Sequence, residues 1–165
     1  YRPYEAKQAR LHSLAGGDPL EDFDDRSYRG KWNTAANEED LDLVLDTKKR
    51  MGDRPVIVSV NLKNPMVMAE LEPCADAILV DYGVSPQAVL DVITGRFIPC
   101  GLLPLQMPAD MDTVERQAED EAFDMECYVD SEGHVYEFGF GMNFDGVIED
   151  ERTEKYGRQN RRRTK

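Results

Sequence analysis

Two short runs of apolar, largely β-branched residues constrain the fold of this chain more than any other feature. Residues 55–62 have the sequence PVIVSVNL and residues 77–82 have the sequence AILVDY, with apolar side chains at positions of both parities. Because successive side chains of a strand point to opposite faces, these runs predict strands that are buried on both faces. Strands of this kind are typical of a parallel sheet that helices cover on each side.

Helix signals follow these strands at the short spacing of βα units. Asn37 as an N-cap, acids after it, basic residues at the end and then Gly52 predict a helix over residues 40–51. Asn64-Pro65 predicts a short helix over residues 66–71. Ser85-Pro86 predicts another over residues 86–94, which Gly95 ends.

Residues 102–107 predict a third, weaker strand, and Pro104 inside it favours an edge position or an irregular end. Strands that alternate with helices at these lengths predict right-handed crossovers and one parallel sheet. A helix over residues 110–117 follows. Residues 127–130 and 134–138 then predict a hairpin around the turn at residues 130–133.

The length of 165 residues predicts a single α/β domain, since domains commonly hold about 100–200 residues. We expect an irregular, loop-rich segment over residues 1–36, an α/β sandwich domain over residues 37–148 and a basic, disordered tail over residues 149–165. A nucleic-acid or anionic-surface arm is the alternative for the tail. Three parallel strands make a thin sheet, because about four to six are commoner, so we expect part of the sheet to be missing on its N-terminal side.

The charge distribution narrows the classes of partner. The formal net charge is -13, although residues 150–165 hold seven basic and three acidic residues. The part of the chain before residue 150 is strongly acidic and repels phosphate backbones, which argues against nucleic acid as a partner. No apolar run approaches the ~20 residues that span a bilayer, so we expect no membrane insertion.

Cysteine and histidine usage gives little support to a metal site. Cys74, Cys100 and Cys127 are odd in number and widely spaced, no C-x-x-C occurs, and the histidines are His12 and His134. We therefore expect three free thiols, no metal and no cofactor. The acidic residues 18–25 lack the glycine spacing of an EF-hand loop, so they do not predict a calcium site either.

Three segments, in order, resemble the C-terminal domain of glycoside hydrolase family 3. They are PVIVSVNLKNP at residues 55–65, ADAILVDYG with PCGLLP at residues 75–83 and 99–104, and YEFGFGMNF at residues 136–144. The resemblance implies a three-layer α/β sandwich from a β-glucosidase-like or β-xylosidase-like enzyme. It also implies a preceding barrel domain, absent from this chain, that carries the nucleophilic aspartate and most of the sugar-binding residues. Cys100 stands where the family usually has serine, at a scaffold position.

The same resemblance assigns one catalytic residue. In many family members the proton donor is a glutamate a few residues before a Gly-Asp-Arg-like turn, and Asp25-Arg26 resembles that turn. Glu21 then takes the place of the general acid/base. The alternative is that residues 18–25 form a solvated acidic loop. The family implies periplasmic or secreted polysaccharide breakdown.

Two further features have a structural and a functional interpretation. Phe138, Phe140 and Phe144 share one parity, so they predict an aromatic face that either packs in the core or stacks on sugars. Gly83 follows a buried strand at the end where α/β folds bind ligands, but one glycine is no phosphate fingerprint.

The expected function is that of a fragment of a retaining exo-β-glycosidase acting on terminal β-linked sugars, inactive without its barrel domain. The alternative is a non-catalytic α/β interaction or carbohydrate-binding module. A flavodoxin-like small-ligand binder would need a glycine-rich or hydroxyl-rich loop after a strand, which is not evident.

Overall fold

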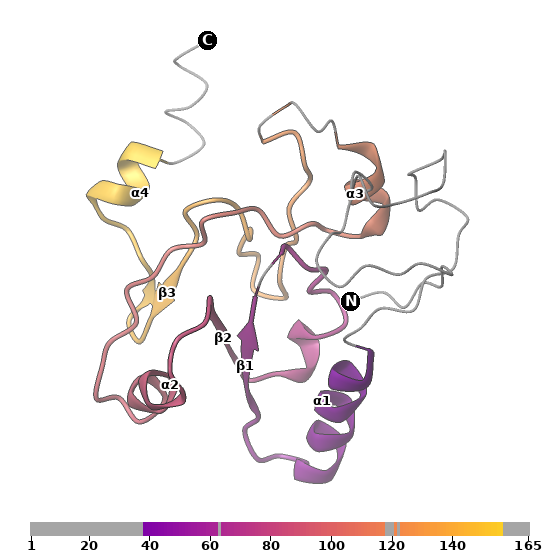
Figure 1. Cartoon of the computed structure of the whole chain (residues 1–165), viewed down its shortest axis with the longest axis vertical. Helices are drawn as coiled ribbons and strands as arrows, with labels where there is room; N and C mark the ends of the chain where they lie inside the picture. The colour runs from indigo at the N-terminus through magenta and orange to yellow at the C-terminus, as the bar shows by residue number, and fades with distance from the viewer. Residues whose placement is uncertain (1–37, 63, 118–120, 122, 157–165) are drawn as a thin grey trace.

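The computed structural model describes residues 38–62, 64–117, 121 and 123–156, and they form an α/β domain with a small parallel sheet (Figure 1). The elements, in chain order, are α1 (Glu38–Met51), β1 (Ile57–Asn61), the 3₁₀ turn η1 (Glu72–Cys74), β2 (Ala77–Asp81), α2 (Pro86–Ile93), α3 (Met111–Arg116), β3 (Met142–Asn143), β4 (Gly146–Val147) and α4 (Glu151–Tyr156). The predicted N-cap Asn37 lies outside the described residues. No helix in the described ranges is long and apolar enough to cross a bilayer.

The sheet confirms the two predicted strands and their parallel pairing. β1 pairs with β2 from Ile57 opposite Ala77 to Asn61 opposite Asp81. The predicted burial of both strand faces is wrong for β1. Val58 packs against the core on one face, whereas Ile57 on the opposite face is 45% exposed.

Helix α1 contributes to the core and is tied to the residue just before β2. Leu41 is buried in the core, and Val44, one turn later, packs against it. At the other end of the helix, the ammonium of Lys48 lies 2.6 Å from Oδ2 of Asp76, just before β2. The same oxygen accepts a 2.7 Å hydrogen bond from the amide of Val56, so one carboxylate joins α1, β1 and β2.

The core lies between α1, the sheet and the chain that links β1 to β2. Its buried cluster consists of Leu41, Leu62, Met66, Met68, Leu71 and Met107. The predicted helix over residues 66–71 is wrong, because residues 66–68 have no helical structure and η1 follows Leu71 instead. Three consecutive buried residues, 66–68, leave no polar face for a surface helix, and burial of this stretch therefore overrides the Asn64-Pro65 signal.

The third predicted strand, over residues 102–107, is wrong. These residues form no strand and do not join the parallel sheet. Their backbone pairs instead with the C-terminal part of the domain: the amide of Leu103 donates to the carbonyl of Phe140 (2.7 Å), and that of Met107 donates to the carbonyl of Tyr136 (3.0 Å). Pro104 has no amide hydrogen to donate, which accounts for the interrupted pairing.

The remaining elements follow the sequence more closely. Asp110 caps α3 by accepting a 2.7 Å bond from the amide of Thr113, and an antiparallel bridge between Val129 and Val135 confirms the predicted hairpin. Helix α2 forms as predicted behind its Ser85 cap but contains no fully buried residue. We expected disorder from residue 149 onward, whereas the structure forms α4; residues 157–165 lie outside the described part.

Candidate functional site

The predicted general acid/base, Glu21, and the acidic residues 18–25 around it lie outside the described residues. Glu21 therefore stays a prediction, and the geometry below concerns the polar networks of the described domain. Four carboxylates in these networks have shifted pKa values: Asp76, Asp81, Asp130 and Asp150.

One network lies at the carboxyl ends of β1 and β2, just before Gly83. Asp81 accepts hydrogen bonds at Oδ1 from the side-chain amide of Asn61 (2.7 Å) and from the backbone amides of Gly83 (2.8 Å) and Val84 (3.3 Å). Gly83 has φ +98°, a backbone conformation that glycine adopts without strain. The turn thus leads the chain from β2 toward α2.

These bonds decide the chemistry that Asp81 can perform. The hydrogen bond from the Gly83 amide, followed by that from Asn61, lowers its pKa. A carboxylate held in its ionised form is a poor proton donor near neutrality. Asp81 therefore orders the strand-end turn. An Asp two residues before a Gly, directly after a strand, is a sequence signal for this turn, and the prediction from Gly83 alone missed it.

A second network organises the hairpin over residues 128–136. The carboxylate of Asp130, 7% exposed, accepts bonds from the amides of Glu132 (3.0 Å) and His134 (2.8 Å) and lies 2.9 Å from Nδ1 of His134. Burial favours the neutral acid, but the hydrogen bonds from His134 and Glu132 outweigh it, so the pKa of Asp130 is lowered. Asp130 is thus a turn residue held as an anion.

Glu72 of η1 joins this hairpin to the core. Its Oε2 accepts a 2.9 Å hydrogen bond from the hydroxyl of Tyr128, and its Oε1 lies 3.4 Å from the hydroxyl of Ser131. Burial, together with the bond to Glu72, raises the pKa of Tyr128 to about 12. Burial also raises the pKa of Tyr136, whose ring centroid lies 5.4 Å from that of Tyr128. Sequence spacing gives no signal for the hydrogen bond between Tyr128 and Glu72, which are 56 positions apart.

The aromatic residues of the YEFGFGMNF segment do not share one face. Phe140 stacks on Tyr136 with ring centroids 5.1 Å apart, Phe138 meets Phe123 edge-on at 5.9 Å, and Phe144 is 60% exposed. The parity prediction is wrong because residues 136–141 do not form a strand, and Gly139, at φ +89°, turns the backbone within them. Phe138 and Phe140 are packing residues here.

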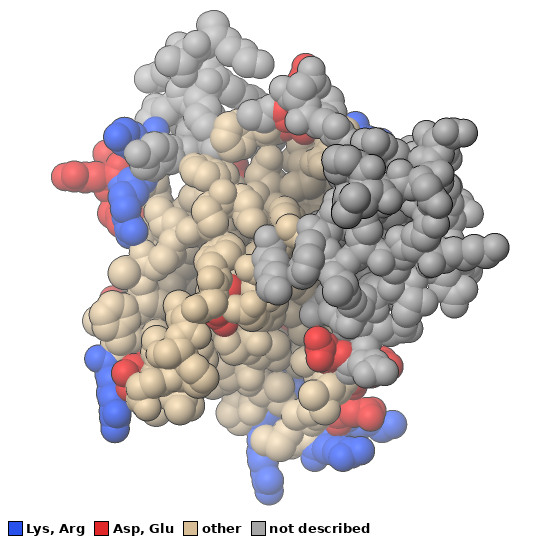
Figure 2. All heavy atoms as spheres, viewed as in Figure 1, with Lys and Arg blue, Asp and Glu red and all other residues tan. Residues whose placement is uncertain are grey.

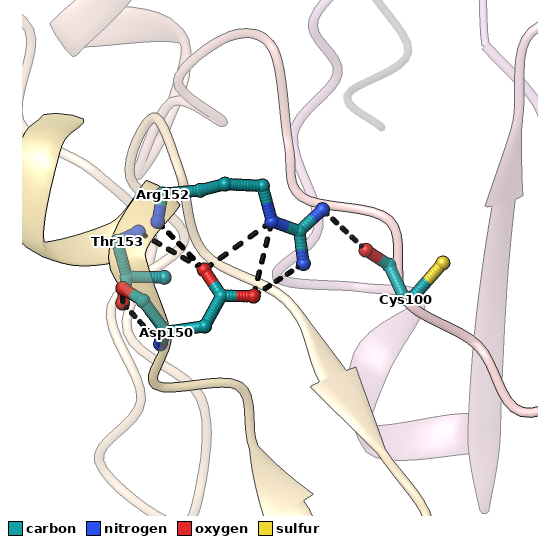
Figure 3. A network of polar contacts seen from close by, with 4 residues as sticks. All are labelled: Cys100, Asp150, Arg152 and Thr153. Carbon is teal, nitrogen blue, oxygen red and sulfur yellow. Dashed lines mark hydrogen bonds and ion pairs between the residues drawn. The ribbon is translucent and has the colours of Figure 1, made fainter.

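A third network fastens the start of α4 to the PCGLLP segment (Figure 3). The guanidinium of Arg152 donates to Oδ2 of Asp150 through Nη2 (2.6 Å) and Nε (3.0 Å), while Nη1 donates to the carbonyl of Cys100 (2.9 Å). The hydrogen bond to Arg152 is the main cause of the lowered pKa of Asp150. This carboxylate too is held as an anion.

The described domain therefore contains carboxylates suited to structural roles. All four carboxyl groups with a clear shift have lowered pKa values, the reverse of what a proton donor near neutrality needs. No group of three His, Cys, Asp or Glu side chains that could hold a metal ion occurs in the described ranges. Cys74, Cys100 and Cys127 are free thiols, of which Cys127 is buried.

Comparisons with known proteins identify the domain. Residues 11–144 match the model of the glycosyl hydrolase family 3 C-terminal domain. Over 91 residues, 55% of the chain, the sequence is 40% identical to beta-glucosidase C of Emericella nidulans, of which the match covers 14%. Over 90 residues it is 36% identical to the probable beta-glucosidase C of Aspergillus flavus, covering 13% of that protein.

The match thus spans about a seventh of the length of these curated relatives. No solved structure matches the chain. The family match includes all three segments on which the resemblance rested, and it extends over most of the sequence. This chain belongs to the glycosyl hydrolase family 3 C-terminal domain family.

Proposed function

We propose that this chain is the C-terminal domain part of a retaining exo-acting β-glycosidase that removes terminal β-linked sugars. The observation that carries the proposal is the family match over residues 11–144, joined with 40% identity to a protein named beta-glucosidase C. Because the chain corresponds to a small share of that relative, the catalytic activity is proposed for a longer protein that includes this domain.

In that protein Glu21 acts as the general acid/base. It protonates the glycosidic oxygen as the bond to the sugar breaks, while a carboxylate outside this chain attacks the anomeric carbon and forms a glycosyl–enzyme intermediate. Glu21 then removes a proton from the water that hydrolyses this intermediate. Asp76, Asp81, Asp130 and Asp150, whose pKa values are lowered, are unsuited to this role.

The sheet geometry supports a second part of the proposal. A two-stranded parallel sheet is small for an α/β domain, and Ile57 on the outer face of β1 is 45% exposed. We propose that further strands and helices of the longer protein complete this sheet to a three-layer sandwich. Ile57 then becomes buried, as the apolar sequence of β1 predicts.

The proposal makes the isolated chain inactive, because one carboxylate cannot carry out a double displacement. Purified chain should hydrolyse an aryl β-glucoside no faster than buffer does. Turnover that a substitution within this chain abolishes would contradict this part of the proposal, because both catalytic groups would then lie within these 165 residues.

The role of Glu21 is tested in a longer protein that contains both this domain and the barrel. Glu21→Gln should lower kcat/KM, which reports formation of the glycosyl–enzyme intermediate, far more for glycosides with poor leaving groups than for activated aryl glycosides, since only the former need protonation in that step. Asp22→Asn, the neighbouring acid of the same cluster, is the matched control and should affect both substrates little. No loss with either substrate would show that Glu21 is an ordinary surface acid, and equal losses in kcat/KM would show that it does not protonate the leaving group. Glycoside binding without hydrolysis by that longer protein would favour the non-catalytic alternative.

A further inference from the structure

We draw no further inference here: the strongest candidate, the exposed apolar side chains of helix α2 and the loops beside it (residues 82–98), which lie in a surface region with few charged side chains (Figure 2), carries none because nothing in the structure shows what covers them.

Discussion

The hydroxyl of Tyr128 donates a 2.9 Å hydrogen bond to Oε2 of Glu72, a residue 56 positions earlier in the chain. The bond links the hairpin near the C-terminal end of the domain to the 3₁₀ turn that precedes β2. Since Tyr128 also packs against the buried core cluster, one side chain supplies both an apolar and a polar contact across the domain.

Replacing Tyr128 with phenylalanine should lower the free energy of unfolding by about 1–2 kcal/mol, because a partly buried carboxylate loses its donor. Urea unfolding followed by circular dichroism measures the change. Tyr82→Phe is the control, since Tyr82 is 51% exposed, and it should have little effect on the free energy of unfolding. Equal stability of the two variants would show that the Glu72 contact contributes nothing.

We expect Tyr128 also to make the stability of the fold sensitive to alkaline pH. Its pKa is raised to about 12 in the folded chain, above the value of about 10 in an unfolded chain. The protonated phenol therefore stabilises the fold fully below pH ~10, and this contribution is lost as the pH rises toward 12. The free energy of unfolding should fall less steeply over this interval in Tyr128→Phe than in the wild type. Parallel pH profiles would contradict the assignment.

Gly141 predicts a steric limit within the YEFGFGMNF segment. A Cβ atom at this position would lie 2.3 Å from the carbonyl oxygen of Gly101 and 3.0 Å from Cδ2 of Leu102. Gly141→Ala should therefore destabilise the domain by about 1–3 kcal/mol, as overpacking against backbone does. Gly101→Ala is the matched control, because a Cβ atom at residue 101 would meet nothing within 4 Å beyond its chain neighbours, and thermal melts should show little change.

Local sequence signals predicted those parts of the fold that depend on local interactions. The parallel pairing of β1 with β2, the Ser85 and Asp110 caps and the 130–133 turn all follow from residues close together in the chain. Contacts between distant segments carried no such signal. The bond from Tyr128 to Glu72 and the docking of residues 102–107 on the C-terminal hairpin depend on tertiary packing, which the periodicity of one segment does not specify.

In the candidate site too, features set by local sequence could be predicted and those set by tertiary packing could not. The Asp-x-Gly spacing at residues 81–83 is sufficient to predict the strand-end turn, whereas Gly83 alone is not. The parity of Phe138, Phe140 and Phe144 was misleading, because parity has structural meaning only in a strand. Glu21 came from resemblance to the family and lies outside the described residues.

We expect Arg152 to stabilise the attachment of α4 to the rest of the domain. Its guanidinium contacts Asp150 and the carbonyl of Cys100 together, and a lysine ammonium cannot reproduce this fork. In Arg152→Lys we expect hydrogen exchange of the α4 amides to be several-fold faster than in the wild type. Arg54→Lys, at an exposed position before β1, should leave the exchange of α4 unchanged. Unaltered exchange in both variants would show that α4 is held by other contacts.

Azide rescue of Glu21→Gln, in the longer protein proposed above, tests the central claim most directly. Loss of the acid/base leaves the glycosyl–enzyme intermediate of an activated aryl β-glucoside without a base to activate water, and azide attacks it without one. We predict that azide restores turnover of Glu21→Gln but not of the wild type or Asp22→Asn, and that the product is the β-glucosyl azide. Absence of rescue would contradict the role of Glu21, and an α-glucosyl azide would contradict the retaining mechanism.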